Sequence, residues 1–178
     1  ITTRNFKELL LNHLGFKQVG ETDIYSRFFQ DTNCELTVDF DKQTLIYPKE
    51  KGFKVDAATT CNFSAPENFV VFECVCRLLE KGYRPDHLEL ERTWTLGHGQ
   101  KSGRADICVS TPDGSETLII IECKTTGPEF NKAVQDTKAD GGQVFSYWQQ
   151  EPSAKWLMLY TSDYKDNVLS YKEMTISC

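Results

Sequence analysis

The chain has 178 residues, enough for one domain with a substantial core, and its 39% hydrophobic and 26% charged residues are typical of a folded protein rather than a disordered one. No segment approaches the roughly 18 apolar residues of a membrane span, and no signal peptide is evident, so we expect a cytoplasmic protein without a membrane partner. The net charge of −6 argues against a nucleic-acid binder held by bulk positive charge.

The cysteines exclude a disulfide or zinc framework. There are seven, an odd number, and no two of them form a CxxC pair. We therefore interpret them as reduced side chains packed as small hydrophobic groups in a reducing compartment. Because the chain begins with Ile1 rather than Met, we also expect it to be a fragment of a longer protein.

The N-terminal third predicts a small α/β lobe. Residues 6–16 place apolar side chains at helical spacing, with Gly15 as the expected stop. Three β-rich runs follow at 24–30, 34–40 and 44–47, separated by turn residues, which is the pattern of a meander. We interpret residues 1–62 as this accessory lobe and 63–178 as the main domain.

The main domain alternates helices and strands. A helix is expected from Pro66 to Lys81, with Gly82 at its C-terminal cap. Three consecutive antiparallel strands follow, then two helices interrupted by Gly141 and Gly142, then a buried strand beside the third strand, and a final edge strand. Their ranges are 88–96, 105–110 and 117–124 for the first strands, 129–140 and 143–150 for the helices, and 155–162 and 168–174 for the last strands. This order predicts an α/β fold with a central mixed sheet of four or five strands flanked by helices.

The strands expected at 105–110 and 117–124 carry three charged residues, Asp106, Glu122 and Lys124. Residues i and i+2 of a strand project from one face, so Glu122 and Lys124 point together while Cys123 points away. A hairpin centred on Gly114 places Asp106 opposite Glu122, and facing residues share a side of the sheet. A two-residue turn at Asp113 and Gly114 would instead shift the pairing by one and turn Asp106 away, and the sequence leaves both registers open.

Asp106 and Glu122, if they converge, suit Mg²⁺, with Mn²⁺ as a substitute, because a hard cation takes oxygen ligands and keeps several waters. Such a metal binds a scissile phosphate and activates a water molecule. Lys124 would orient or help to deprotonate that water and offset negative charge. The carbonyl oxygen of Cys123 is a further candidate metal ligand.

The segments GRADI (103–107) and IIIECK (119–124) resemble the PD-(D/E)xK nuclease superfamily, with Ala105 where proline is usual. Gln143 and Tyr147 form a QxxxY pattern, similar to an additional motif of bacterial recombination nucleases and type I restriction enzymes. On a helix, i and i+4 share a face, so both side chains are placed to reach a phosphate or the catalytic lysine.

Residues 65–164 resemble the N-terminal nuclease domain of type I restriction subunits and of single-chain restriction-modification enzymes fused to an adenine methyltransferase. The resemblance implies a restriction-endonuclease-like fold and metal-dependent cleavage of double-stranded DNA. It also implies motor, methyltransferase and specificity domains or subunits outside this chain. In this family a glutamate on the first helix often completes the metal site; Glu67 matches that position best, and Glu73 is its competitor.

Each of these residues also has a structural interpretation. Asp106, Glu122 and Lys124 are then solvated surface charges. The Gln143 and Tyr147 pair becomes a packed helix face, and Glu67 serves the helix macrodipole.

Other polar residues are expected to have structural roles or remain ambiguous. We interpret Glu89 and Glu91 as strand-surface charges, and His87 and His98 as turn residues. Lys101 and Arg104 either contact the DNA backbone or belong to a solvated loop. The alternative functions are a structure-specific nuclease such as a Holliday junction resolvase, and a nuclease-like DNA-binding module that does not cleave.

Overall fold

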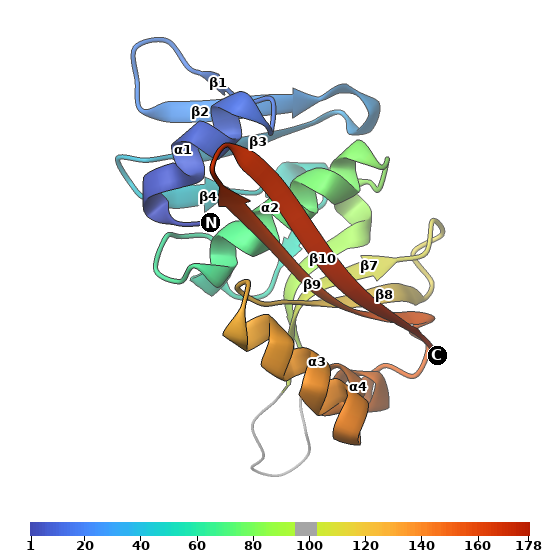
Figure 1. Ribbon diagram of the computed structural model, residues 1–178. Coiled ribbons are helices and arrows are strands. Elements are labelled where there is room, and N and C mark those ends of the chain that lie inside the picture. The colour runs from blue at the N-terminus through green and yellow to red at the C-terminus, as the bar shows by residue number, and fades with distance from the viewer. Residues whose placement is uncertain (95–102) are drawn as a thin grey trace.

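Two β-sheets and four α-helices make up the part of the chain that the computed structural model describes, residues 1–94 and 103–178 (Figure 1). The mixed α/β class predicted from the sequence is therefore confirmed. None of the helices in these residues is long and apolar enough to cross a membrane.

The N-terminal segment forms the expected helix and antiparallel meander, to which β1 adds a strand that was not predicted. Its elements are α1 (Thr3–Asn12), β1 (Lys17–Gln18), β2 (Ile24–Phe29), β3 (Cys34–Asp39) and β4 (Thr44–Ile46), and the strands pair in chain order. The helix starts and ends earlier than predicted. Thr2 and Asn5 form a capping box that begins it at Thr3, and the chain leaves the helix after Asn12, before Gly15.

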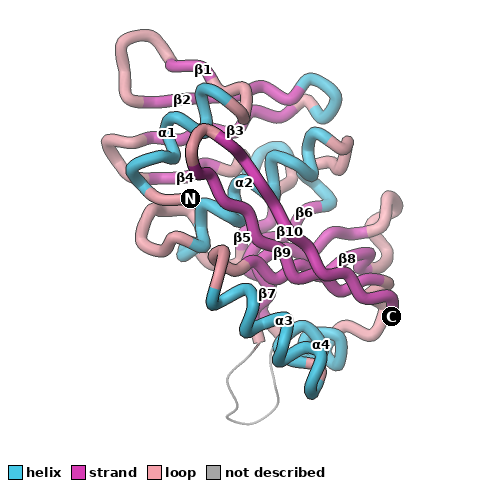
Figure 2. The backbone as a smooth tube through the Cα atoms, viewed as in Figure 1, coloured by secondary structure: helices cyan, strands magenta, loops and turns pink. Residues whose placement is uncertain are grey.

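The main sheet has six strands, in the order β10-β9-β8-β7-β6-β5 (Figure 2). Its elements are β5 (Lys54–Val55), α2 (Glu67–Glu80), β6 (Leu88–Thr93), β7 (Arg104–Ser110), β8 (Thr117–Cys123), α3 (Pro128–Asp140), α4 (Gly142–Gln150), β9 (Trp156–Lys165) and β10 (Val168–Ser177). As predicted, β6, β7 and β8 are antiparallel, β9 lies beside β8, and β10 is an edge strand. The predicted four or five strands were wrong, because β5 has only two residues and leaves no periodic signal.

Short 3-10 turns connect several of these elements. They span Gln30–Thr32, Lys49–Lys51, Ala58–Thr60 and Pro85–His87. His87 is thus a turn residue, as expected, whereas His98 lies outside the described residues.

Helices cover both faces of the main sheet. Ile107 and Ile121 pack in the same buried cluster as α2, whereas Cys108 and Ile120 pack with residues of α3 and α4. Cys108 of β7 and Ile120 of β8 therefore lie on the face that α3 and α4 cover, and Ile107 and Ile121 lie on the face that α2 covers. The flanked mixed sheet is therefore as predicted.

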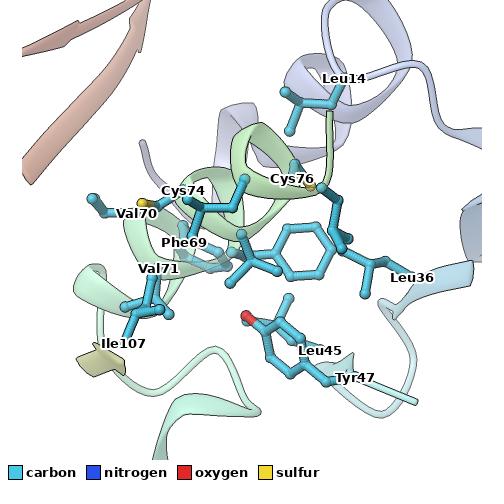
Figure 3. Packing of buried hydrophobic residues seen from close by; sticks show 14 of the residues in the cluster. Leu14, Leu36, Leu45, Tyr47, Phe69, Val70, Val71, Cys74, Cys76 and Ile107 are labelled. Carbon is cyan, nitrogen blue, oxygen red and sulfur yellow. The ribbon is translucent and has the colours of Figure 1, made fainter. Parts of the chain in front are cut away.

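The N-terminal lobe and the main domain share one hydrophobic cluster. Leu14, Leu36 and Leu45 of the lobe belong to the same cluster as Val71 of α2 and Ile107 of β7, and Val71 lies beside Ile107 (Figure 3). Helix α2 is thus buried between the lobe and the sheet. The division at residue 62 stays a prediction, and the pairing of β5 with β6 also crosses it.

The hairpin between β7 and β8 has the register that brings the two carboxylates together. Ile107 pairs with Ile121 and Val109 with Ile119, pairs that are symmetric about position 114. Continuing this register by one residue places Asp106 opposite Glu122. A bulge between Val109 and Ser110 absorbs the mismatch with the turn. Of the two registers that the sequence left open, the structure therefore has the one centred on Gly114.

Candidate functional site

A cleft of about 580 Å³ opens where β6, β7 and β8 approach the start of α2 and one face of α4. All six predicted catalytic side chains line it, together with Arg104, Glu91 and residues of the loop before α2. The lining residues are Thr59, Ser64, Ala65, Glu67, Asn68, Glu91, Thr93, Gly103, Arg104, Asp106, Glu122, Lys124, Gln143, Ser146 and Tyr147. The structure thus brings together predicted catalytic residues that are up to 80 positions apart, from Glu67 to Tyr147.

Glu122 and Lys124 form the centre of the cleft. The Lys124 Nζ donates to Glu122 Oε1 at 2.5 Å and lies 3.8 Å from Glu67 Oε2. Glu67 is the first residue of α2, so the helix brings its carboxylate to the end of β8. Three side chains from two elements are therefore joined through one ammonium group.

Glu67, rather than Glu73, is the helix glutamate of this cleft. Glu73 lies two turns further along α2, where it is 1% exposed and paired with Arg77 and Tyr160 on the opposite side of the sheet. It does not line the cleft. Of the two glutamates that the sequence left open, only Glu67 therefore lies in the cleft, and its role at a metal stays a prediction.

Asp106 ties β7 to β8 beyond their last backbone pair. Its Oδ2 accepts a hydrogen bond of 2.7 Å from the backbone N–H of Cys123, and the residue is only 8% exposed. The Cys123 thiol points to the opposite face, where it is fully buried beside Cys74. Only the carbonyl of Cys123 therefore remains a candidate ligand, and that role stays a prediction.

The cleft concentrates negative charge in a buried place. Burial, reinforced by Glu122 and Glu67, raises the pKa of Asp106 well above its usual value. Burial also raises the pKa of Glu122 to about 7, although Lys124 opposes the rise. For Lys124, burial lowers the pKa, but Glu122 and Glu67 outweigh it and the pKa is raised. The lysine therefore stays charged at neutral pH, while the carboxylates need a further cation or a proton.

The donor set fits a hard divalent cation. Glu122 Oε2 is buried and has no hydrogen-bond partner among the described residues, because the neighbouring Tyr147 hydroxyl donates to the Arg104 carbonyl instead. A buried carboxylate oxygen without a partner at an open cleft is a candidate metal ligand. In residues 1–94 and 103–178 no three His, Cys, Asp or Glu side chains surround a common point. Mg²⁺ needs no such group, because it is held by one or two carboxylates and keeps several waters.

Gln143 and Tyr147 share one face of α4, as their spacing predicted. Gln143 Nε2 donates to the Tyr147 hydroxyl at 2.5 Å, and that hydroxyl donates to the backbone carbonyl of Arg104 at 2.6 Å. The Tyr147 ring is 1% exposed and stacks on Trp94 with a centroid separation of 5.5 Å. The pair therefore contacts the start of β7 in this structure.

Glu91 is the site residue that the sequence analysis missed, and its interpretation as a surface charge was wrong. It is 6% exposed and forms an ion pair with Nε of Arg104. The pairs Leu90 with Ile107 and Arg92 with Ala105 place it across from Asp106. The signal was present in the antiparallel order of β6 and β7, but it required their register. Lys101 lies outside the described residues.

The loop before α2 also contributes to the cleft without any motif in the sequence. Thr59 and Ser64 line the wall opposite α4, and Asn68 fixes this loop through hydrogen bonds to the carbonyls of Thr59 and Asn62 at 2.8 and 3.0 Å. The N-terminal segment thus supplies part of the site, and not only part of the core.

Comparison with known proteins identifies the family. Residues 66–175, more than half of the chain, match the family described as Type I restriction enzyme R protein N terminus (HSDR_N). No curated protein matches the chain. The match begins at the start of α2 and includes β6 to β9 and most of β10. The chain therefore belongs to the family of type I restriction enzyme R protein N-terminal domains.

Proposed function

We propose that this domain is the DNA-cleaving module of a type I or related restriction enzyme, with a restriction-endonuclease-like fold and the PD-(D/E)xK type of site. It hydrolyses phosphodiester bonds of double-stranded DNA with Mg²⁺, for which Mn²⁺ substitutes. The observation that carries this proposal is the buried Oε2 of Glu122, which has no hydrogen-bond partner among residues 1–94 and 103–178 and lies in one cleft with Asp106 and Lys124. The family match supports it independently.

Asp106 and Glu122 are the residues that would hold the metal, with the Cys123 carbonyl as a third oxygen donor. When bound, the cation supplies Lewis-acid stabilisation of the phosphate and lowers the pKa of a bound water. In its absence the two carboxylates repel each other, and their pKa values are raised by burial. Their protonation therefore opposes metal binding at low pH.

Lys124 acts as a cationic hydrogen-bond donor. Its pKa is raised by Glu122 and Glu67 despite burial, so it does not serve as a base at neutral pH. It orients the attacking water and offsets the charge that develops on the phosphate. Glu67, 3.8 Å from the lysine Nζ, holds the ammonium group in the cleft when Glu122 turns to another partner.

The grip on DNA is provided mainly by other parts of the enzyme in this proposal. The chain carries a net charge of −6, which gives little non-specific attraction to phosphate. Motor, methyltransferase and specificity components of a restriction-modification enzyme supply recognition and deliver the duplex to the cleft. The acidic domain then contributes the hydrolytic step.

The proposal is tested by plasmid cleavage with the complete enzyme and Mg²⁺. Asp106→Asn and Glu122→Gln keep the shape of each side chain and are expected to abolish cleavage. Asp86→Asn, at an exposed turn outside the cleft, is the matched control and is expected to cleave like the wild type. Cleavage that survives both cleft substitutions contradicts the proposal. If the wild type binds DNA but never cleaves it, a non-cleaving DNA-binding module takes its place.

A further inference from the structure

Arg104 lies at the rim of the cleft with only part of its hydrogen-bonding capacity used. It begins β7, its side chain is 44% exposed, and Glu91 is the acidic residue with which it forms an ion pair in the described part of the chain. A guanidinium group has five N–H donors, and one carboxylate accepts at most two of them in parallel. The remaining donors are available to a second anion.

Glu91 pairs with the Arg104 side chain, and its own backbone has a conformation that is unusual for a strand residue. Its φ is +58°, in the left-handed region that glutamate disfavours, although the backbone pairs on both sides of it are regular. Its side chain is 7% exposed, so its charge needs a cation beside it. A strained backbone and a buried charge at one residue persist only where the surroundings enforce them, and they gather at functional sites.

The backbone of Arg104 is held independently from α4. The Tyr147 hydroxyl donates to the Arg104 carbonyl at 2.6 Å, and the Gln143 amide donates to the same hydroxyl at 2.5 Å. Tyr147 cannot move freely, because its ring is 1% exposed between Trp94 and Gly103. Two elements therefore fix one arginine, β6 through its guanidinium group and α4 through its carbonyl.

We propose that Arg104 binds a phosphate group of the DNA strand in the cleft, and that Glu91, Gln143 and Tyr147 are positioning residues that act through it. The inference rests on the proposed function, since it assigns the phosphate contact of that same site. Asp106 and Glu122 make the cleft acidic, so a phosphodiester needs a fixed positive group beside them. The planar arginine fork matches phosphate geometry better than a lysine. The QxxxY pair then works through Arg104 rather than by touching DNA.

The first test is binding of a short fluorescent DNA duplex to the full-length protein, with Ca²⁺ in place of Mg²⁺ and at several salt concentrations. Arg104→Ala is expected to weaken binding about tenfold and to reduce the slope of log affinity against log salt by about one. Arg92→Ala is the matched control, because Arg92 pairs with Glu89 and Glu151 outside the cleft. A slope for Arg104→Ala equal to that of the wild type overturns the proposal.

The second test asks whether the positioning residues act through Arg104. Glu91→Gln and Tyr147→Phe are each expected to weaken binding by about threefold alone and to have no further effect in an Arg104→Ala background. Glu89→Gln is the matched control on the same strand. Full additivity contradicts the positioning role, and a merely structural role predicts that additivity. If Tyr147→Phe lowers the melting temperature, Gln143→Ala takes its place in the comparison with Arg104→Ala.

The two proposals fail in different ways. Both binding tests are independent of cleavage. If the Arg104 double variants show non-additive effects on binding but the protein never cleaves DNA, the nuclease proposal is refuted and the phosphate site stands. Cleavage that depends on Asp106, together with an unchanged salt slope for Arg104→Ala, gives the opposite result. In that case the metal centre stands and the assignment of Arg104 is wrong.

Discussion

Glu73 and Glu122 are two glutamates buried to nearly the same extent on opposite faces of one sheet, 1% and 2% exposed. Glu73 has both oxygens paired, with Arg77 at 2.6 Å and with the Tyr160 hydroxyl at 2.5 Å. Glu122 has one oxygen bound to Lys124 and the other without a partner in the described residues. The two glutamates are therefore equally buried but differ in how many of their carboxylate oxygens have a partner.

Under the proposed function, the difference separates a structural charge from a metal-binding one. The Glu73 network is closed, and Tyr171 covers it with its ring centroid 4.0 Å from Arg77, so it fixes α2 to β9 and needs nothing further. The Glu122 cluster is open to a cleft, and one of its carboxylate oxygens has no partner in the described residues. A buried pair satisfied on all sides contributes specificity to the fold, whereas we interpret an unpaired carboxylate oxygen at a cleft as a candidate ligand position.

Replacing the cationic side chain of each network, Lys124 or Arg77, should give the largest difference in cleavage rate. Lys124→Met should reduce DNA cleavage by about 10²- to 10³-fold, because it removes the group that orients water and offsets charge. Arg77→Met should lower the melting temperature but leave the cleavage rate per folded molecule unchanged. Initial rates of plasmid cleavage at a temperature where both variants are folded decide this. Equal rate losses in the two variants would break the comparison.

The pH dependence of stability should come from the open cluster. The pKa of Glu122 is raised from 4.5 to about 7 by burial, so the folded protein holds this proton more tightly than the unfolded chain. The resulting stabilisation is complete below pH 4.5 and is lost as the pH rises to about 7, by up to about 3 kcal/mol. Urea unfolding without metal should show this loss, and Glu122→Gln should reduce it. An unchanged pH profile in that variant would contradict the burial argument.

Neutralising Glu73 should lower the free energy of unfolding, whereas neutralising Glu122 should not. Glu73→Gln leaves Arg77 without its carboxylate and should cost about 2 kcal/mol of unfolding free energy, since the arginine keeps some solvent contact. Glu122→Gln should not lower the same quantity at neutral pH, because it removes a carboxylate whose ionisation is destabilising there and leaves Lys124 paired with Glu67. Denaturant melts of the two variants measure both. A larger loss for Glu122→Gln would mean that its cluster is structural after all.

The smallest expected effect concerns the wall of the cleft. A Cβ on Gly103 would lie 3.1 Å from Tyr147 Cε1, so Gly103→Ala should shift the ring at a cost of about 1 kcal/mol. Because the shift disturbs the hydrogen bond to Arg104, DNA binding should weaken to the level of Tyr147→Phe. Thermal unfolding and the duplex-binding assay check the two parts. Wild-type thermal stability together with wild-type DNA affinity would show that the Tyr147 ring adjusts to the added Cβ without cost.

Most elements and the main site were predictable from local sequence pattern. The run ending in Glu122 and Lys124 is apolar enough to be a buried strand, and alternation places both side chains on one face. The range of α2 followed from its capping residues, with Gly82 after the helix, whereas Gly15 misplaced the end of α1. Local pattern therefore identified Glu122 and Lys124 and much of the fold, whereas Glu67, Gln143 and Tyr147 were identified through the family resemblance.

The remaining features depend on register and packing, which a single sequence does not encode locally. The bulge between Val109 and Ser110 decides that Asp106 faces the cleft, and no residue type marks it. Helix α2 is buried almost all round, so amphipathicity could not choose between Glu67 and Glu73. Glu91 became visible only when the β6 and β7 pairing was known.

The most direct test of the central claim is calorimetric titration of Mn²⁺ into the protein. We predict that the wild type and Glu73→Gln bind the metal alike, whereas Asp106→Asn and Glu122→Gln, shown to be folded by circular dichroism, lose binding. This result would assign the metal to the open cluster. If all four proteins bind equally, or if none binds, Asp106 and Glu122 do not form a metal site and the comparison with Glu73 has no functional meaning.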